Sequence, residues 1–357
     1  MTAGRRAREL LAREWLPFLA VVLLVVVSGW TRRLPRWSRD EAEVLALLAA
    51  LLVTVQGLTL SGLVRRLARR IEAGRWLPLR LVSATWLLSM VVTNDVALLA
   101  VVPLTLALHR DDRGNLVMLE VLAANAGSAL TPIGNPQNLY LFWHYRLRAG
   151  EFVAAIAPFS VLFLAVIAGL ALLASRGSGV APLGPRRPID HRAALGWTTL
   201  LGIVVLVVVH ALPLACLLAV PVAALLLDRR ALRIDAGLLL AFACFFGIAD
   251  DLRVVLAGPL ARAGHVFLFS ALASQVVSNV PAALLFSEFT ADWRALLWGV
   301  SVGGFGTLVA SLANLIAWRL YVAHPGTRDA GRFTLRLHLA GAAMFLLGLA
   351  LWGVLGP

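Results

Sequence analysis

The sequence predicts an all-α polytopic membrane protein with about nine spanning helices and two re-entrant hairpins. The first observation is composition: the 357 residues are 60% hydrophobic and 14% charged, with a mean hydropathy of +0.86, outside the range of soluble domains. The second is that apolar blocks long enough to cross a hydrocarbon layer of about 30 Å recur from end to end. The third is that two of these blocks carry a polar interruption near their middle.

The first half of the predicted fold, residues 1–174, forms one transmembrane repeat. Block 77–108 is too long for one span and is interrupted by Thr93-Asn94-Asp95, so we expect a hairpin that turns there. Block 115–142 contains two prolines and a glycine that end a helix, so we expect a broken helix. The remaining apolar blocks of this half are uninterrupted and are interpreted as spanning helices: 16–30, 42–64 and 152–174.

The second half, residues 212–357, repeats this order of elements. Block 265–289 is interrupted by Ser278-Asn279-Val280-Pro281, which predicts a second hairpin. Block 295–318 is the expected second broken helix. The uninterrupted blocks of this half are 212–227, 236–256 and 334–354.

The segment between the two halves, residues 175–211, is predicted to be a cytoplasmic linker followed by one extra crossing at 193–209. With the N-terminus inside, 23 of the 32 basic residues then fall on the cytoplasmic side, as the positive-inside rule requires. The bias is imperfect, since the outer loop 31–41 holds four of the exceptions. The two hairpins open on opposite faces, so the second half is an inverted copy of the first.

Residue matches between the halves support this symmetry. Asn94 and Asn279 occupy the two predicted hairpin tips. The two broken helices share a glycine, a threonine and an asparagine, each pair 176 positions apart: Gly127 with Gly303, Thr131 with Thr307, and Asn138 with Asn314.

The broken segments need partners for their backbone groups, because an unpaired N–H or C=O in hydrocarbon costs several kcal/mol. A simple proline kink would account for Pro132 and Pro136, but it needs neither Asn135 nor Gln137. Paired discontinuities near the membrane midplane favour a binding site, where half-helix N-termini face an anion and side-chain oxygens hold a cation. This arrangement is typical of secondary transporters.

The tip and break sequences resemble those of the ion transporter superfamily, which includes citrate and divalent-anion symporters, arsenite permeases and NhaD-type antiporters. The resemblance implies an elevator-like carrier, usually a homodimer, with sodium and substrate sites at the hairpin tips. It nominates these binding residues: Thr93, Asn94, Ser278 and Asn279 at the tips, and Thr131, Gly134, Asn135, Asn138, Thr307 and Asn314 at the breaks. Asp95, next to the first tip, is added as a binding candidate because of its charge and not because of the resemblance.

This sequence departs from the family pattern at the third tip position. The dicarboxylate carriers have Ser-Asn-Thr at both tips, whereas Asp95 and Val280 stand third here, and Gly306-Thr307 replaces a proline-rich second break. A dicarboxylate or tricarboxylate substrate and two full sodium sites therefore do not follow from the resemblance.

Acidic residues inside the apolar blocks are candidates for ion coupling. Asp95 either couples the ion gradient to transport or caps the second hairpin arm by accepting from backbone N–H groups. Asp250 is a second coupling candidate, although Asp250 and Asp251 with Arg253 also fit a partly solvated ion pair. Glu120 is expected on a solvated face.

The predicted function is secondary active transport of a small inorganic or organic anion across the cytoplasmic (inner) membrane, coupled to sodium or protons. The alternatives are a sodium/proton antiporter or an arsenite-type permease, with an anion channel less favoured. No HExxH or metal-spaced histidine pair is present, and we expect no enzyme, no cofactor and no metal beyond bound sodium. The net charge of +13 comes from arginines that lie between the apolar blocks, where they orient the helices in the lipid membrane. It therefore does not predict nucleic-acid binding. The identity of the anion, the coupling ion, symport against antiport and the oligomeric state stay open.

Overall fold

The computed structural model describes residues 15–69, 76–108, 112–174, 189–261, 265–327 and 329–356, and every regular element within these ranges is a helix. Five of the described helical segments are long and apolar enough to cross a membrane, which confirms the all-α polytopic class: α3 (Arg39–Leu60), α9 (Ala149–Ala174), α10 (His191–Val208), the segment Arg229–Leu252 that leads into α12 (Ala236–Ala261), and α17 (Ala330–Leu355). Further apolar helices are shorter, so the number of crossings stays a prediction.

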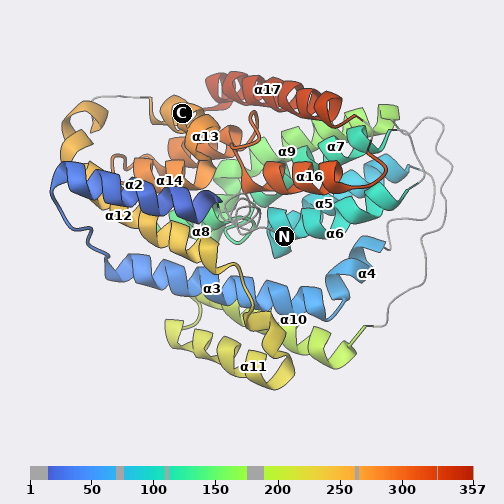
Figure 1. The fold of residues 1–357 in the computed structure, drawn as a ribbon, viewed down its shortest axis with the longest axis horizontal. Coiled ribbons are helices and arrows are strands. Elements are labelled where there is room, and N and C mark those ends of the chain that lie inside the picture. The colour runs from blue at the N-terminus through green and yellow to red at the C-terminus, as the bar shows by residue number, and fades with distance from the viewer. Residues whose placement is uncertain are drawn as a thin grey trace, which may run out of the picture.

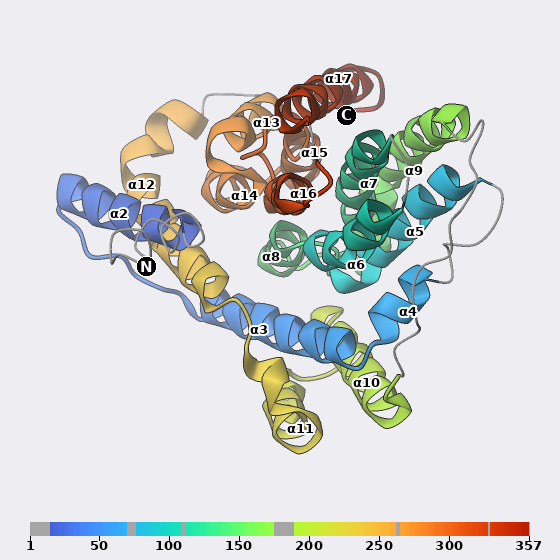
Figure 2. The same cartoon turned by 45° about the vertical axis from the view of Figure 1, so that its right-hand side comes forward.

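One group of helices, which we call the frame, lies along one side of the molecule (Figures 1 and 2). Its long helix α3 packs against α10, α11 and α12, and α12 packs against α2. The short helix α4 (Leu63–Arg69) leads away from α3 toward the first hairpin. The frame elements not yet bounded are α2 (Trp15–Thr31), α11 (Ala219–Leu227) and the 3₁₀ helices η1 (Leu214–Leu218) and η2 (Arg229–Leu232).

The expected span at 212–227 differs in detail from the structure. It consists of the 3₁₀ turn η1 followed by the nine-residue helix α11. Pro221 lies in the first turn of α11, where its missing N–H group is tolerated because the first N–H groups of a helix have no helical partner.

Two further groups of helices face the frame, and each contains a hairpin and a broken helix (Figure 2). We call the hairpins hairpin 1 and hairpin 2, and the interrupted helices break 1 and break 2. The first group comprises hairpin 1, which consists of α5 (Leu77–Val92) and α6 (Asn94–Ala107), break 1, which consists of α7 (Arg113–Ser128) and α8 (Pro136–His144), and the helix α9. The second comprises hairpin 2, which consists of α13 (Val266–Val277) and α14 (Asn279–Ser287), break 2, which consists of α15 (Trp293–Gly303) and α16 (Leu312–Ala323), and the helix α17. The groups follow chain order, since α8 packs against α14 of the second group and α16 packs against α6 and α7 of the first.

Each hairpin turns at one residue with an unusual backbone conformation. Thr93 has φ 74° and ψ 154°, and Ser278 has φ 77° and ψ 155°. This region is strained for residues other than glycine, so surrounding contacts must hold both turns in place. The arms have 16, 14, 12 and 9 residues, and at 1.5 Å per residue none exceeds about 24 Å. Arms of this length suit hairpins that turn back within the membrane, and this re-entry stays a prediction.

The glycines matched between the halves lie where helices approach closely. A Cβ atom on Gly127 of α7 would collide with the Trp86 carbonyl of α5, and one on Gly303 of α15 would collide with the Ser274 side chain of α13. The same residue type therefore permits the same contact between hairpin and broken helix in both halves.

The expectation of a solvated face at Glu120 is wrong. Glu120 is fully buried, Thr105 of α6 donates a hydrogen bond to its Oε1 atom, and its Oε2 atom has no partner. The reason is that α7 is enclosed by α5, α6, α9, α16 and α17, so this turn has no side left for solvent.

Candidate functional site

Each hairpin tip is bound to the break of its own half by a main-chain hydrogen bond. The N–H group of Asn94 donates to the carbonyl of Gly134 at 3.0 Å, and that of Asn279 donates to the carbonyl of Ala310 at 3.0 Å. Gly134 and Ala310 are themselves 176 positions apart. The predicted tips and breaks therefore meet, and they do so in the same way in both halves.

The two threonines nominated at the breaks hold the hairpin arms. Thr131 donates its hydroxyl hydrogen to the carbonyl of Met90 at 2.6 Å, and Thr307 donates to the carbonyl of Gln275 at 2.9 Å. Met90 and Gln275 each lie three residues before a tip turn. Both hydroxyl groups thus fix an arm to a break.

The two asparagines nominated at the breaks bind carbonyl groups that the interrupted helices leave without helical partners. Asn138 Nδ2 lies 3.0–3.1 Å from the carbonyl oxygens of Ser128, Ala129 and Thr131. Asn314 Nδ2 donates to the carbonyls of Gly304 and Thr307, the equivalents of Ser128 and Thr131, at 3.0 and 2.9 Å. These two side chains therefore satisfy carbonyl groups that would otherwise lack a hydrogen-bond partner where the helices are interrupted.

Asn135 begins the second half-helix of break 1. Its Oδ1 atom accepts from the N–H of Asn138 at 2.9 Å, which is an N-cap of α8, and its Nδ2 atom donates to Ser128 Oγ at 3.2 Å. The asparagine therefore stabilises the start of α8 beside the tip of hairpin 1.

Asn125 joins the two halves, and the sequence analysis did not nominate it. Its Oδ1 atom accepts from Asn94 Nδ2 at 3.4 Å and from Ser311 Oγ at 3.1 Å, and its Nδ2 atom donates to Asn314 Oδ1 at 2.7 Å. The only local signal was an asparagine inside an apolar run one turn before the break. Its role depends on residues far along the chain, which sequence periodicity does not report.

A cavity of about 30 Å³ lies where the two tips and the two breaks meet. Four helices begin at this cavity, because their first residues line it: Asn94 of α6, Pro136 of α8, Asn279 of α14 and Leu312 of α16. The N-terminus of each helix carries roughly half a positive elementary charge, so the four ends favour an anion between them. No arginine or histidine is among the described residues that line the cavity.

Asp95 also lines the cavity, one residue after the tip. Its Oδ1 atom is buried and has no hydrogen-bond partner. The bonds expected of a helix cap, from the N–H groups of Ala97 or Leu98, are not formed; Ala97 instead donates to the carbonyl of Thr93. A buried carboxylate oxygen without a partner is costly, so a cation or a proton is favoured there.

The frame supplies one wall of the cavity through α12. This wall is apolar and consists of Leu238, Ala241, Phe242 and Phe245. These side chains carry no hydrogen-bonding group, so none of them forms a hydrogen bond to a tip or a break. The tips form their main-chain hydrogen bonds with the breaks of their own halves.

The second coupling candidate, Asp250, lies further along α12 and does not line this cavity. It accepts from the N–H of Arg36 at 3.3 Å. Its neighbour Asp251 is fully buried and accepts from Ser28 Oγ of α2 at 2.6 Å. The side chain of Arg253, the expected ion-pair partner, lies outside the described residues. The structure therefore does not bring Asp250 together with Asp95.

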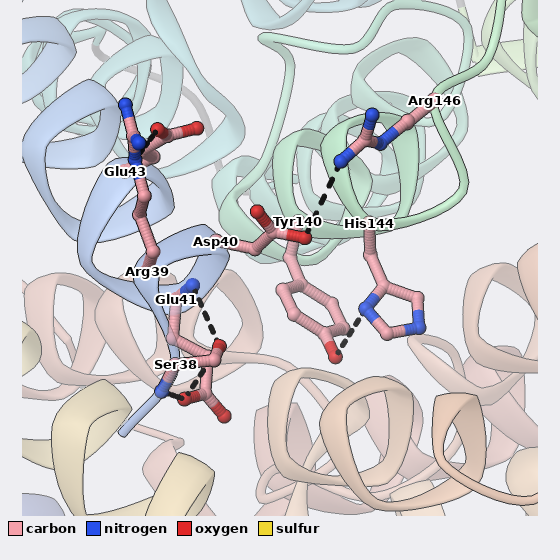
Figure 3. Close-up of polar contacts among 8 residues, drawn as sticks. All are labelled: Ser38, Arg39, Asp40, Glu41, Glu43, Tyr140, His144 and Arg146. Carbon is pink, nitrogen blue, oxygen red and sulfur yellow. Dashed lines mark hydrogen bonds and ion pairs between the residues drawn. The ribbon is translucent and has the colours of Figure 1, made fainter.

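A second polar cluster lies where the start of α3 meets the end of α8 (Figure 3). Arg146, just after α8, forms an exposed ion pair with Asp40 of α3 at 3.8 Å. Tyr140 of α8 contacts both His144, at 3.3 Å, and Ser287 of α14, at 2.8 Å. This cluster connects the frame, break 1 and hairpin 2. Within the part of the chain that the structure describes, no group of three His, Cys, Asp or Glu residues is placed to hold a metal ion.

Membrane-length helices surround a cavity that is lined by two hairpin tips, two breaks and α12. This arrangement defines a polytopic membrane transporter. The chain belongs to the citrate transporter family, whose family model matches residues 9–303. Multi-pass insertion in the cell membrane follows from this membership and from the apolar helices.

Two known proteins are similar over most of the chain, and a third is similar over a smaller part of it. The inner membrane protein YbiR of Escherichia coli is 37% identical over 291 residues, which cover 76% of this chain and 78% of YbiR. The transporter MJ0456 of Methanocaldococcus jannaschii is 35% identical, covering 71% of this chain and 73% of that protein. The silicon efflux transporter LSI3 of rice is 33% identical over 38% of this chain and 28% of its own length.

Proposed function

We propose that the protein is a secondary active transporter that binds a small anion between the two hairpin tips and couples its movement to protons or sodium. The observation that carries this proposal is the convergence of four helix N-termini on one cavity. Their partial positive charges supply an anion site without any arginine. Amide and hydroxyl groups of Asn94, Ser278, Asn279 and Ser311 in the lining add further hydrogen bonds.

Asp95 is the proposed coupling residue. A fixed negative charge in the cavity would repel an anion, so binding requires that a proton or a sodium ion neutralise this carboxylate as the anion arrives. The unpaired Oδ1 atom is available for that purpose. Anion binding and cation binding then favour each other, which is the requirement for coupled transport.

An elevator-like movement of the tips along α12 is the proposed transport step. The polar groups of each tip bond to its own break, whereas the α12 wall offers only apolar side chains. Sliding along such a wall breaks no hydrogen bond to it. The cavity of about 30 Å³ holds only about one or two water-sized groups, so a larger anion would enter only when the tips and α12 move apart.

Sodium/proton exchange without an anion is the second candidate function. The observation that favours it is the presence of Asp95, the only charged side chain among the described residues that line the cavity. In that case the four helix ends would stabilise the ionised carboxylate itself between cation-binding events.

The experiment that tests the proposal uses purified protein in liposomes with labelled anions of several classes, including arsenite, sulfate and citrate. We expect saturable uptake of one class that an imposed pH or sodium gradient drives above equilibrium. Uptake that never saturates would instead indicate a channel. Sodium and pH gradients that dissipate each other without any anion would establish the second candidate.

A further inference from the structure

Asn138 and Asn314, the two break asparagines, differ in the surroundings of their amide oxygen, Oδ1. Asn314 Oδ1 accepts a hydrogen bond from Asn125 Nδ2 at 2.7 Å. Asn138 is fully buried, yet its Oδ1 atom has no hydrogen-bond partner. The Nδ2 atoms of the two residues make equivalent contacts, so the difference lies in what the other half of the molecule offers.

The residue that corresponds to Asn125 in the second half is Ser301, 176 positions later. Ser301 is 6% exposed, and its Oγ atom is also buried without a partner. Helix α15, which carries Ser301, packs against α8, which carries Asn138, just as α7 with Asn125 packs against α16 with Asn314. The two unpaired oxygens therefore occupy the positions whose counterparts are joined directly.

The shorter side chain of Ser301 agrees with the absence of a hydrogen bond in this second pair. A serine side chain ends one atom beyond Cβ, whereas the Nδ2 atom of asparagine lies two atoms beyond it. Buried polar atoms without partners cost about 1–3 kcal/mol each, so two of them at matched positions indicate a bound group that bridges the gap.

The chemistry around the gap selects a cation. The carbonyl groups of Ser128 and Ala129, at the C-terminal end of the half-helix α7, lie next to the amide of Asn138. Helix C-termini carry partial negative charge, and unwound carbonyls with side-chain oxygens are the usual sodium ligands in broken-helix transporters. In the other half, the position is taken by the electropositive Nδ2 group of Asn125.

We propose that a sodium ion binds between Asn138 Oδ1 and Ser301 Oγ, and that the Asn125 amide takes its place in the other half. The protein then has one such site, not two, and the site lies behind the tips and not between them. This inference rests on the proposed function, since it supplies that transporter with a cation, but it concerns binding and can be tested without transport.

The test measures the unfolding temperature of the purified protein while sodium chloride replaces choline chloride at constant ionic strength and pH. We expect a saturable rise for the wild type, because a ligand that binds only the folded state stabilises it. Ser301→Asn should abolish this rise and increase stability in sodium-free buffer, because the new amide reaches Asn138. Ser301→Ala, which removes the ligand and adds nothing, should weaken sodium affinity by about 10–100-fold.

The reverse substitution is the matched control. Asn125→Ser should lower stability without sodium and add a second sodium-dependent rise, since it opens the equivalent gap. A wild type that does not respond to sodium would mean that water bridges the two oxygens, and would overturn the inference. An unchanged response in both Ser301 variants would place the sodium elsewhere and overturn it as well. Neither of these two results changes the anion uptake that is measured in liposomes. The sodium site can therefore be refuted while the proposed anion transport still holds.

Discussion

The tips and breaks of the two halves make matching hydrogen bonds, but the sequences that interrupt the two broken helices differ. Both tips donate to a break carbonyl, both break threonines bind an arm, and both break asparagines bind the freed carbonyls. Yet break 1 contains Pro132 and Pro136, whereas break 2 contains no proline and relies on Gly306, at φ 103°. The comparison separates what the architecture requires from what one half alone contributes.

Gln275 shows how break 2 manages without proline. Proline has no N–H group, so it leaves no donor unpaired when it interrupts a helix. In break 2 the N–H of Thr307 donates to Gln275 Oε1 at 3.0 Å, and Gln275 Nε2 donates to the carbonyls of Gly303 and Phe305 at 2.8 and 3.0 Å. The equivalent residue in the first half is Met90. Break 1 thus avoids unpaired N–H groups by using proline, whereas break 2 pairs its N–H group with the side chain of Gln275.

The largest effect is expected where the halves agree most closely, at the tips. Asn94→Ala and Asn279→Ala should each reduce uptake to background while the protein still folds and inserts, because each amide lies at the cavity. Uptake in liposomes and gel filtration in detergent check this. Normal uptake kinetics in either variant would show that the tips do not bind substrate, and loss of folded protein would show that the amides are structural.

A stability difference is expected where the halves diverge, at Gln275 and Met90. Gln275→Leu should lower the free energy of unfolding by about 1–3 kcal/mol, because it leaves the Thr307 N–H without its partner. Met90→Leu conserves volume and should cost less than about 1.5 kcal/mol. Thermal unfolding of both variants measures the difference, and equal losses would refute the role assigned to Gln275.

The smallest effect is expected at the matched threonines. Thr131→Val and Thr307→Val keep the side-chain shape. Thr131→Val removes one hydrogen bond, to the Met90 carbonyl, and should cost about 1 kcal/mol, whereas Thr307→Val removes the bond to the Gln275 carbonyl and the one accepted from the Ala310 N–H, and should cost about 1–2 kcal/mol. The same unfolding assay applies. A loss several times larger in one half would mean that the two breaks are not mechanically equivalent.

The sequence predicted most of the fold because its signals are local. Apolar block length located the helices to within a few residues, and the polar interruptions located both tips and both breaks. Contacts between distant segments were not predictable. Asn125 binds residues up to 189 positions away, and Glu120 is buried by helices from both halves. Such roles are set by packing, which no short pattern encodes.

The candidate site was predicted in part for the same reason. All the nominated tip and break residues lie in or beside the region where tips meet breaks, because matched discontinuities mark that region in the sequence. Thr131, Asn138, Thr307 and Asn314, however, direct side-chain donors to backbone carbonyls. A polar residue type at a break does not distinguish a ligand from a structural support; only the hydrogen-bond partners do.

Asp95, for which the second half has only Val280, is the residue that we propose couples the ion gradient to anion movement. The most direct test compares gradient-driven uptake with equilibrium exchange in Asp95→Asn, using Asp250→Asn as the control that lies outside the cavity. We predict that Asp95→Asn still exchanges the anion but no longer concentrates it in response to a pH or sodium gradient, while Asp250→Asn does both. Wild-type accumulation by Asp95→Asn, with unchanged dependence on pH and sodium, would contradict the account.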